Sequence, residues 1–222
     1  MFKKLTDSVA KKAANQANYA AESQARQVQY QATNAVKGKA RDFVAKLKKM
    51  NKKVGGKIIQ SFSDFKSSWE KNAKNPAQSI LHFLIAAYNF AHGKKEDGEH
   101  MATIILAKPL LEENSNSPTG FGLSKSGEGN LMQHMAEVPE IVRSYLGGTP
   151  ENDYKLDVNK IVMTIVGEGT AGDDTTIAVQ SAGKDEPSSC NLRKNNSGQW
   201  KLFNIDSLTT DVKPPKSKAG DF

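Results

Sequence analysis

Four side chains in the C-terminal part of the chain have types suited to proton transfer or to holding a polar ligand: His82, Tyr88, Tyr145 and Asp185. Enzymatic proton transfer would need a buried acid, base or nucleophile facing a cavity beside a second such group. None of the four belongs to a nucleophile elbow, a Walker loop or a Rossmann fingerprint. We therefore treat them as candidate ligand-binding residues and predict no catalytic residue.

The sequence gives little support for a metal site or a cofactor. His92 and His100 flank Glu96 and Glu99, but two lysines lie between them and no two histidines are four residues apart on one helix face. Cys190 is the single cysteine, which excludes an internal disulfide and a cysteine-based zinc site. We expect neither metal nor cofactor.

The net charge of +7 is unevenly distributed along the chain. Residues 1–66 carry a net charge of +11, and the remaining residues carry −4. The sequence is thus a basic N-terminal arm followed by a mildly acidic body, a pattern that bears on binding partners rather than on fold.

The arm, residues 1–56, predicts one long helix. It has no proline and a single glycine, Gly38, before the Gly55-Gly56 pair that would end the helix. Its second half has an apolar seam with heptad-like spacing, which is typical of a coiled coil. We predict that this seam and the neighbouring lysines bind a partner, through Val36, Phe43, Leu47, Met50, Val54, Lys46, Lys48, Lys49, Lys52 and Lys53.

Three kinds of partner suit a basic amphipathic helix. It could pair with a helix of another protein or of a second copy, it could lie on an anionic membrane, or it could bind nucleic acid. Nucleic acid is the least favoured, because the arm has only two arginines, Arg26 and Arg41. Asp7, Lys11 and Lys12 interrupt the apolar run that a secretion signal needs, so we expect a cytoplasmic protein. This expectation includes a location at the surface of a membrane.

The body is predicted to be α+β. Residues 57–75 form an aromatic helix that links the arm to the body, and residues 76–212 form a domain with a central apolar helix after Asn75-Pro76. A further helix is expected over 97–107, followed by a loop over 114–129. A helical segment is expected over 130–146, with Pro139 marking a break between two short helices. Strands over 158–167, 175–181, 188–194 and 199–205 would form a bent antiparallel sheet wrapped around the helix like a cone. Residues 213–222 are expected to be disordered.

A set of short motifs carries a resemblance. They are Ser144-Tyr145-x-Gly147, Pro150-Glu151-Asn152-x-Tyr154, Ser181-x-Gly183-x-Asp185-x-Pro187, Leu192-Arg193 and Gly198-x-Trp200-Lys201-Leu202. Over residues 73–215 the chain resembles an uncharacterised bacterial-type family of domains of unknown function, and it is similar to the cone-shaped domains related to nuclear transport factor 2. The resemblance implies a cone-like fold, but no activity and no catalytic residues. From the residues themselves we expect Arg193 to pair with Asp185 or Glu151.

The function predicted from the sequence is that of a non-enzymatic interaction or scaffold protein, whose basic helix contacts a partner helix, a second copy or an anionic surface. The alternatives are a cone domain that binds a small ligand and, less favoured, an enzyme with an acid or base in its cavity.

Overall fold

The computed structural model describes residues 47–220, all of which belong to one compact unit. The predicted helix over residues 1–46 lies outside the described residues. So do three of the predicted partner-binding residues, Val36, Phe43 and Lys46.

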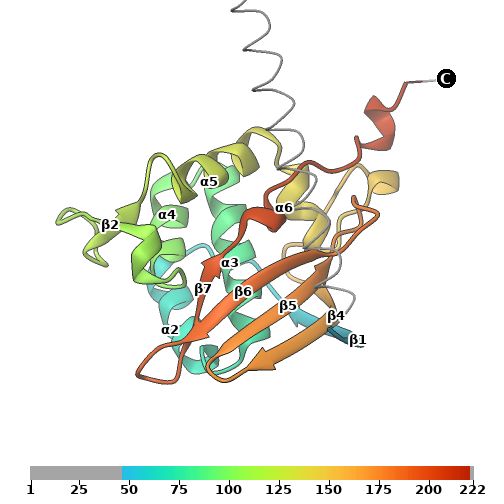
Figure 1. The fold of residues 1–222 in the computed structure, drawn as a ribbon. Coiled ribbons are helices and arrows are strands. Elements are labelled where there is room, and N and C mark those ends of the chain that lie inside the picture. The colour runs from blue at the N-terminus through green and yellow to red at the C-terminus, as the bar shows by residue number, and fades with distance from the viewer. Residues whose placement is uncertain (1–46, 221–222) are drawn as a thin grey trace, which may run out of the picture. The chain divides into compact units, whose positions relative to one another are not determined.

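The described residues form an α+β domain built on a five-stranded antiparallel sheet, as the sequence predicts (Figure 1). Its strand order is β1-β4-β5-β6-β7, and a separate two-stranded sheet pairs β2 with β3. Gly172 and Gly198 take positive φ angles of 62° and 74° in the tight turns after β4 and β6, where a side chain would be strained. The strands are β1 (Lys48–Gly56), β2 (Leu111–Glu113), β3 (Phe121–Leu123), β4 (Ile161–Ala171), β5 (Asp174–Gln180), β6 (Ser188–Lys194) and β7 (Trp200–Asn204).

The helix α3 is the centre of the domain. It contacts α2, α4, α5 and α6 as well as the two edge strands β1 and β7 (Figure 1). Asn75 caps its start by accepting a hydrogen bond from the backbone N–H of Ala77 at 3.0 Å, and Pro76 follows at the first helical position. The helices are α2 (Phe62–Asn72), α3 (Pro76–Ala91), α4 (Lys95–Thr103), α5 (Glu128–Glu137) and α6 (Glu140–Tyr145).

Packed side chains occupy the space between α3 and the sheet. Phe83 is fully buried and Trp200 is 7% exposed, and both belong to one continuous hydrophobic core. Ser79 on α3 donates a hydrogen bond to the backbone oxygen of Trp200 at 2.9 Å, which fixes the helix to β7. The residues that would have lined a ligand cavity in the centre of a cone therefore form core.

The prediction of a helix through Val54 is wrong for residues 48–56, which form the edge strand β1. Val54 pairs with Met163 of β4 and packs in the core, while Leu47 lies against Gly167 and Gly169. A Cβ atom on Gly169 would lie 2.7 Å from Leu47. Burial against β4 outweighs the local helix propensity of a lysine-rich segment. The predicted domain boundary at residue 56 separates this strand from the sheet it belongs to.

Several other boundaries differ from those predicted. The predicted loop over 114–129 contains β3 and the start of α5, and the helix expected over 97–107 ends at Thr103. Residues 213–220 are ordered rather than disordered, because the Tyr154 hydroxyl donates a hydrogen bond to the backbone oxygen of Lys213 at 2.7 Å and a short 3-10 helix, Lys216–Lys218, follows. Arg193 pairs with Asp174 across the β5–β6 ladder, with a shortest distance of 2.5 Å, not with Asp185 or Glu151.

Candidate functional site

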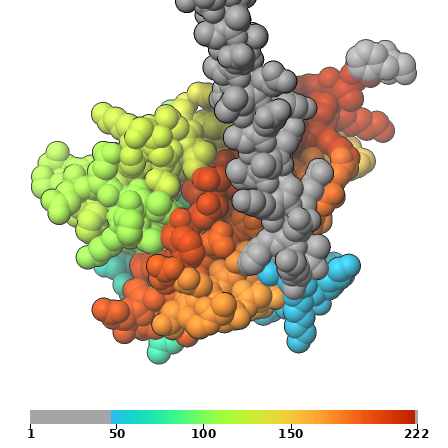
Figure 2. Space-filling view, viewed as in Figure 1, coloured from blue at the N-terminus to red at the C-terminus, as the bar shows by residue number. Residues whose placement is uncertain are grey.

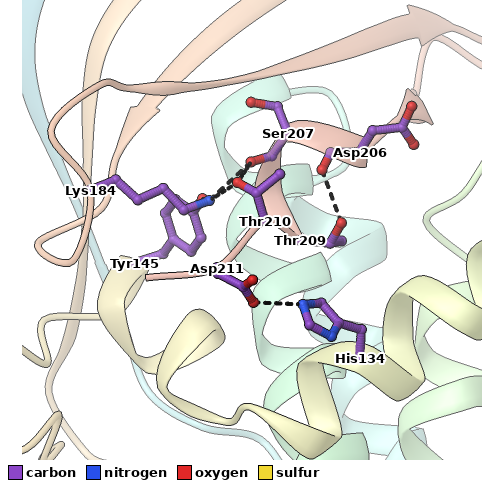
Figure 3. Close-up of polar contacts among 8 residues, drawn as sticks. All are labelled: His134, Tyr145, Lys184, Asp206, Ser207, Thr209, Thr210 and Asp211. Atoms are coloured by element: carbon purple, nitrogen blue, oxygen red, sulfur yellow. Dashed lines mark hydrogen bonds and ion pairs between the residues drawn. The ribbon is translucent and has the colours of Figure 1, made fainter. Parts of the chain in front are cut away.

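The ammonium group of Lys184 is the centre of the densest polar cluster in the described residues (Figure 3). It donates to the Tyr145 hydroxyl at 2.6 Å, to the Thr210 hydroxyl at 2.7 Å and to the Ser207 backbone oxygen at 3.1 Å. The Ser188 hydroxyl lies 3.3 Å from the same nitrogen and 2.7 Å from the Tyr145 oxygen. A cation is thus held by neutral oxygens and by no carboxylate.

Three segments that are distant in the sequence bring this cluster together. Tyr145 is the last residue of α6, Lys184 lies in the β5–β6 turn, and Ser207 and Thr210 follow β7. The turn is fixed by the Ser181 hydroxyl, which donates to Ser144 at 2.6 Å and accepts from the backbone N–H of Gly183 at 3.0 Å. The cluster therefore joins the C-terminal end of α6 to the β5–β6 turn and to the segment after β7.

Burial shifts the ionisation of this cluster toward neutral forms. It lowers the pKa of Lys184 to about 8, more than the nearby charge of Asp211 raises it. Burial also raises the pKa of the Tyr145 hydroxyl and that of the neighbouring Cys190 thiol well above their ordinary values. Lysine and tyrosine side chains with such shifts can transfer protons. Here, however, Tyr145 and Ser188 are 1% and 2% exposed, so the geometry favours a structural role. We call Lys184 and the residues that it contacts, Tyr145, Ser188, Ser207 and Thr210, the clamp.

A hydrogen bond between two side chains lies beside the clamp. Asp211 accepts a hydrogen bond from Nε2 of His134 at 2.9 Å, which links α5 to the segment after β7 (Figure 3). The Asp211 side chain is 78% exposed, so solvent screens this pair. The pair anchors the C-terminal segment without forming a closed site.

A second polar arrangement lines a cavity of about 250 Å³ beside α2. The Ser68 hydroxyl lies 3.0 Å from Nε2 of His82, and Nδ1 of the same ring lies 2.8 Å from the backbone oxygen of Gln78. Since a carbonyl can only accept, Nδ1 carries the proton, and Nε2 accepts a hydrogen bond from Ser68. Burial lowers the pKa of His82 below its ordinary value, against the Gln78 hydrogen bond that raises it, and this favours the neutral ring.

This cavity adjoins a larger open groove of about 770 Å³. The two share Lys57, Ile59, Ser68 and Asn72 in their walls. The larger groove lies next to the end of β1, and its lining mixes hydroxyls and amides with aliphatic side chains. Its charged residues are Lys57, Lys71 and Asp64, so the groove is amphipathic and carries a small positive charge.

The four predicted ligand-binding residues lie in four different places. His82 lines the small cavity, and Tyr145 belongs to the clamp. Tyr88 stacks on His92 with a centroid distance of 3.9 Å, and Asp185 is exposed and pairs with Lys213. The structure does not bring these four residues together into one site.

The predicted partner-binding residues divide into two groups. Leu47 and Val54 are buried, and Met50 is half-buried, so they do not form an exposed seam. The lysines of β1 are exposed, as a contact surface requires: Lys48, Lys49, Lys52 and Lys53.

Sequence reasoning missed the two polar residues that organise the sites, Lys184 and Ser68. Lys184 lies between Gly183 and Asp185 in a loop motif, so its buried ammonium has no sequence signature. Ser68 follows another serine, Ser67, on an amphipathic helix, so its residue type alone did not single it out. A signal was available there, because Ser68 lies one position before Trp69 on the half-buried side of the apolar stripe.

Within residues 47–220, no group of three metal-ligating side chains converges. None of the helices in this range combines the length and apolar content needed to cross a bilayer.

Comparisons with known proteins give one relationship. No curated protein and no solved structure matches the chain. A family profile described as a domain of unknown function (DUF6935) matches residues 57–216, which include α2–α6 and β2–β7 but exclude β1. Because this match covers most of the chain, the protein belongs to the DUF6935 family of domains of unknown function.

Proposed function

We propose that this protein is an interaction module that binds an extended acidic segment of a partner protein along the edge strand β1. The observation that carries the proposal is that β1 is an edge strand with four exposed lysines. Figure 2 shows β1, in blue, projecting at the margin of the sheet.

The two edges of the sheet differ. The outer side of β7 is covered by the segment after α4, where Leu202 receives a hydrogen bond from Ala107 at 2.7 Å and donates one to Ile105 at 3.0 Å. On β1, by contrast, no backbone hydrogen bond to a described residue is formed other than those to β4. An edge with unpaired backbone groups can accept an added strand, and the main chain of that strand then supplies affinity.

Charge decides which kind of strand suits this edge. A second copy of β1 would bring lysine against lysine, and such like-charge pairing opposes self-association. An acidic strand would instead place carboxylates beside Lys48, Lys49, Lys52 and Lys53. The exposed Lys57 extends the same basic character just past the end of β1. An acidic segment is therefore favoured over a second copy.

The proposal extends to features beyond this edge. The apolar positions Val36 and Phe43 would contact a partner helix in coiled-coil fashion, and the domain would act in the cytoplasm as a cone related to nuclear transport factor 2. The buried free thiol of Cys190 suits a reducing compartment. Protein binding through β1 does not depend on these additions.

The test is the affinity of the full-length chain for a short glutamate-rich peptide. Replacing Lys48, Lys49, Lys52 and Lys53 by Glu should weaken binding at least about tenfold, measured by fluorescence anisotropy. The matched control replaces four exposed lysines elsewhere, Lys94, Lys125, Lys155 and Lys216, and should leave affinity within about twofold.

Two results would contradict the proposal. One is equal loss of affinity in both charge-reversal variants, which would show that net charge alone attracts the peptide. The other is binding of the unmodified protein to anionic lipid vesicles or to nucleic acid without binding to the peptide.

A further inference from the structure

We propose that Ser68 and His82 form a nucleophile and base pair that gives the domain a second activity, the hydrolysis of short-chain carboxylic esters. The proposal is independent of the partner binding proposed above, since it rests on the cavity beside α2 rather than on β1.

The pair has the geometry of an activated serine. The Ser68 oxygen and the His82 Nε2 atom are 3.0 Å apart, and the Gln78 carbonyl, 2.8 Å from Nδ1, orients the ring so that Nε2 is the accepting nitrogen. Phe65 packs edge-on against the ring with a centroid distance of 5.4 Å and limits its rotation. A nucleophile, a base and an orienting acceptor are thus arranged in sequence, as covalent catalysis by serine requires.

Both members of the pair reach a cavity. Ser68 and His82 line the small cavity, and Ser68 also lines the larger groove, which opens to solvent. Ser68 is half-buried, whereas His82 is 3% exposed. The base is therefore shielded from bulk water while the nucleophile remains accessible to a ligand in the groove.

The cavity limits the substrate class. A volume of about 250 Å³ is smaller than a typical ligand pocket of about 300–1,000 Å³ and suits a short acyl group, with the rest of the ester in the adjoining groove. Apolar side chains of Leu81 and Ile85 form part of the wall. Asn72 also lines the cavity; its amide donates to the Ser68 backbone oxygen at 2.8 Å and has a second hydrogen for a developing oxyanion.

The reaction balances with water as the only co-substrate. Ser68 Oγ attacks the ester carbonyl carbon, and its proton passes to His82 Nε2. The carbon–oxygen bond to the alcohol then breaks, and the alcohol leaves with the proton from Nε2. Water attacks the acyl-serine, gives its proton to Nε2 and releases the carboxylic acid, after which the proton returns to Ser68.

The chain provides a matched control for this proposal. Ser67 is the preceding residue on α2, is exposed and lines the larger groove, and the hydrogen bond to Nε2 of His82 is formed by Ser68 instead. A serine that reacts only because it is accessible would make Ser67 at least as reactive as Ser68. A serine activated by histidine would make Ser68 the reactive one.

The experiment treats the full-length protein with a fluorophosphonate probe and locates the label by peptide mass spectrometry. Label is expected on Ser68 at a level at least about tenfold above Ser67, and its rate should increase with pH up to a plateau near neutrality as the lowered pKa of His82 is passed. Hydrolysis of p-nitrophenyl acetate should be lost in Ser68→Ala, retained in Ser67→Ala and reduced about 100-fold in His82→Gln.

The labelling experiment on the unmodified protein is sufficient by itself to overturn the proposal. Labelling of Ser68 no greater than that of Ser67 would assign the Ser68–His82 contact a purely structural role, and this result does not depend on whether any variant folds. Hydrolysis of p-nitrophenyl acetate that persists in a folded Ser68→Ala variant would likewise overturn it.

Discussion

The ammonium group of Lys184 and the hydroxyl of Tyr145 lie 2.6 Å apart, although 39 positions separate the two residues in the sequence. This contact joins the end of α6 to the β5–β6 turn. It is also a contact between two groups that burial disfavours in their charged forms. The stability of the fold therefore depends both on this hydrogen bond and on the burial of its two groups.

Removing either partner should have unequal effects on stability. Tyr145→Phe leaves the buried ammonium with one acceptor fewer and should reduce the free energy of unfolding by about 1–3 kcal/mol. Lys184→Met also removes the group whose burial is costly, so it should reduce stability less than Tyr145→Phe. Urea denaturation measures both. Tyr145→Phe should have a smaller effect when Lys184 is already Met, because only the hydrogen bond with Ser188 is then lost, and additive losses would contradict the clamp.

Two partly buried lysines, Lys184 in the clamp and Lys201 in β7, predict how stability changes at alkaline pH. Lys184 and Lys201 have pKa values of about 8 in the folded protein against 10.5 ordinarily, because of burial. Between these values the unfolded chain binds more protons, so the free energy of unfolding should rise as pH increases from 8 toward 9, by less than about 1.4 kcal/mol per pH unit for each lysine.

Above pH 9 the raised pKa of Cys190, and then those of the tyrosines, act in the opposite direction, so the measurement stops there. Lys184→Met and Lys201→Met should each flatten the rise between pH 8 and 9 in urea titrations. A slope in Lys184→Met equal to that of the unmodified protein would show that Lys184 keeps an ordinary pKa.

The histidines predict a loss of stability in acid. Burial lowers the pKa values of His82 and His92 below 6.5, and Arg143 beside His92 adds to its shift by charge repulsion. Below pH 6.5 the unfolded chain binds more protons than the folded one, so stability should fall as pH decreases. His92→Gln should reduce this fall in thermal melts between pH 7 and 5. An unchanged fall would mean that His92 is not buried in its neutral form.

The position of β1 in the sheet predicts a contrast between two neighbouring residues. Val54→Asp places a carboxylate in the core and should reduce the free energy of unfolding by about 3 kcal/mol or more. Lys53→Asp changes an exposed side chain and should alter it by no more than about 0.5 kcal/mol. Chemical denaturation compares the two. Equal small effects would place β1 outside the folded domain.

The sequence predicts most of this domain because its local and global signals agree. The Asn75-Pro76 start of α3, its apolar surface on all sides and the glycine turns of the sheet all identify their elements. Strand β6 begins and ends where predicted. The break at Pro139 also separates α5 from α6 as expected.

The failures have a common physical cause. In β1, the spacing of Leu47, Met50 and Val54 fits a helix, and only pairing with β4 selects the strand. The candidate sites depend on contacts such as Ser68–His82 and Lys184–Tyr145, between residues on different elements. No periodicity within one segment records such contacts.

The most direct test of the proposed function is where an acidic peptide contacts the full-length protein. Titrating the ¹⁵N-labelled chain with a glutamate-rich peptide and recording amide spectra locates the contact residue by residue. Binding to the edge strand predicts the largest shifts at Lys48–Gly56, smaller shifts in β4, and little change in α5. Shifts confined to residues outside β1, or no shifts at any peptide concentration, would contradict the account.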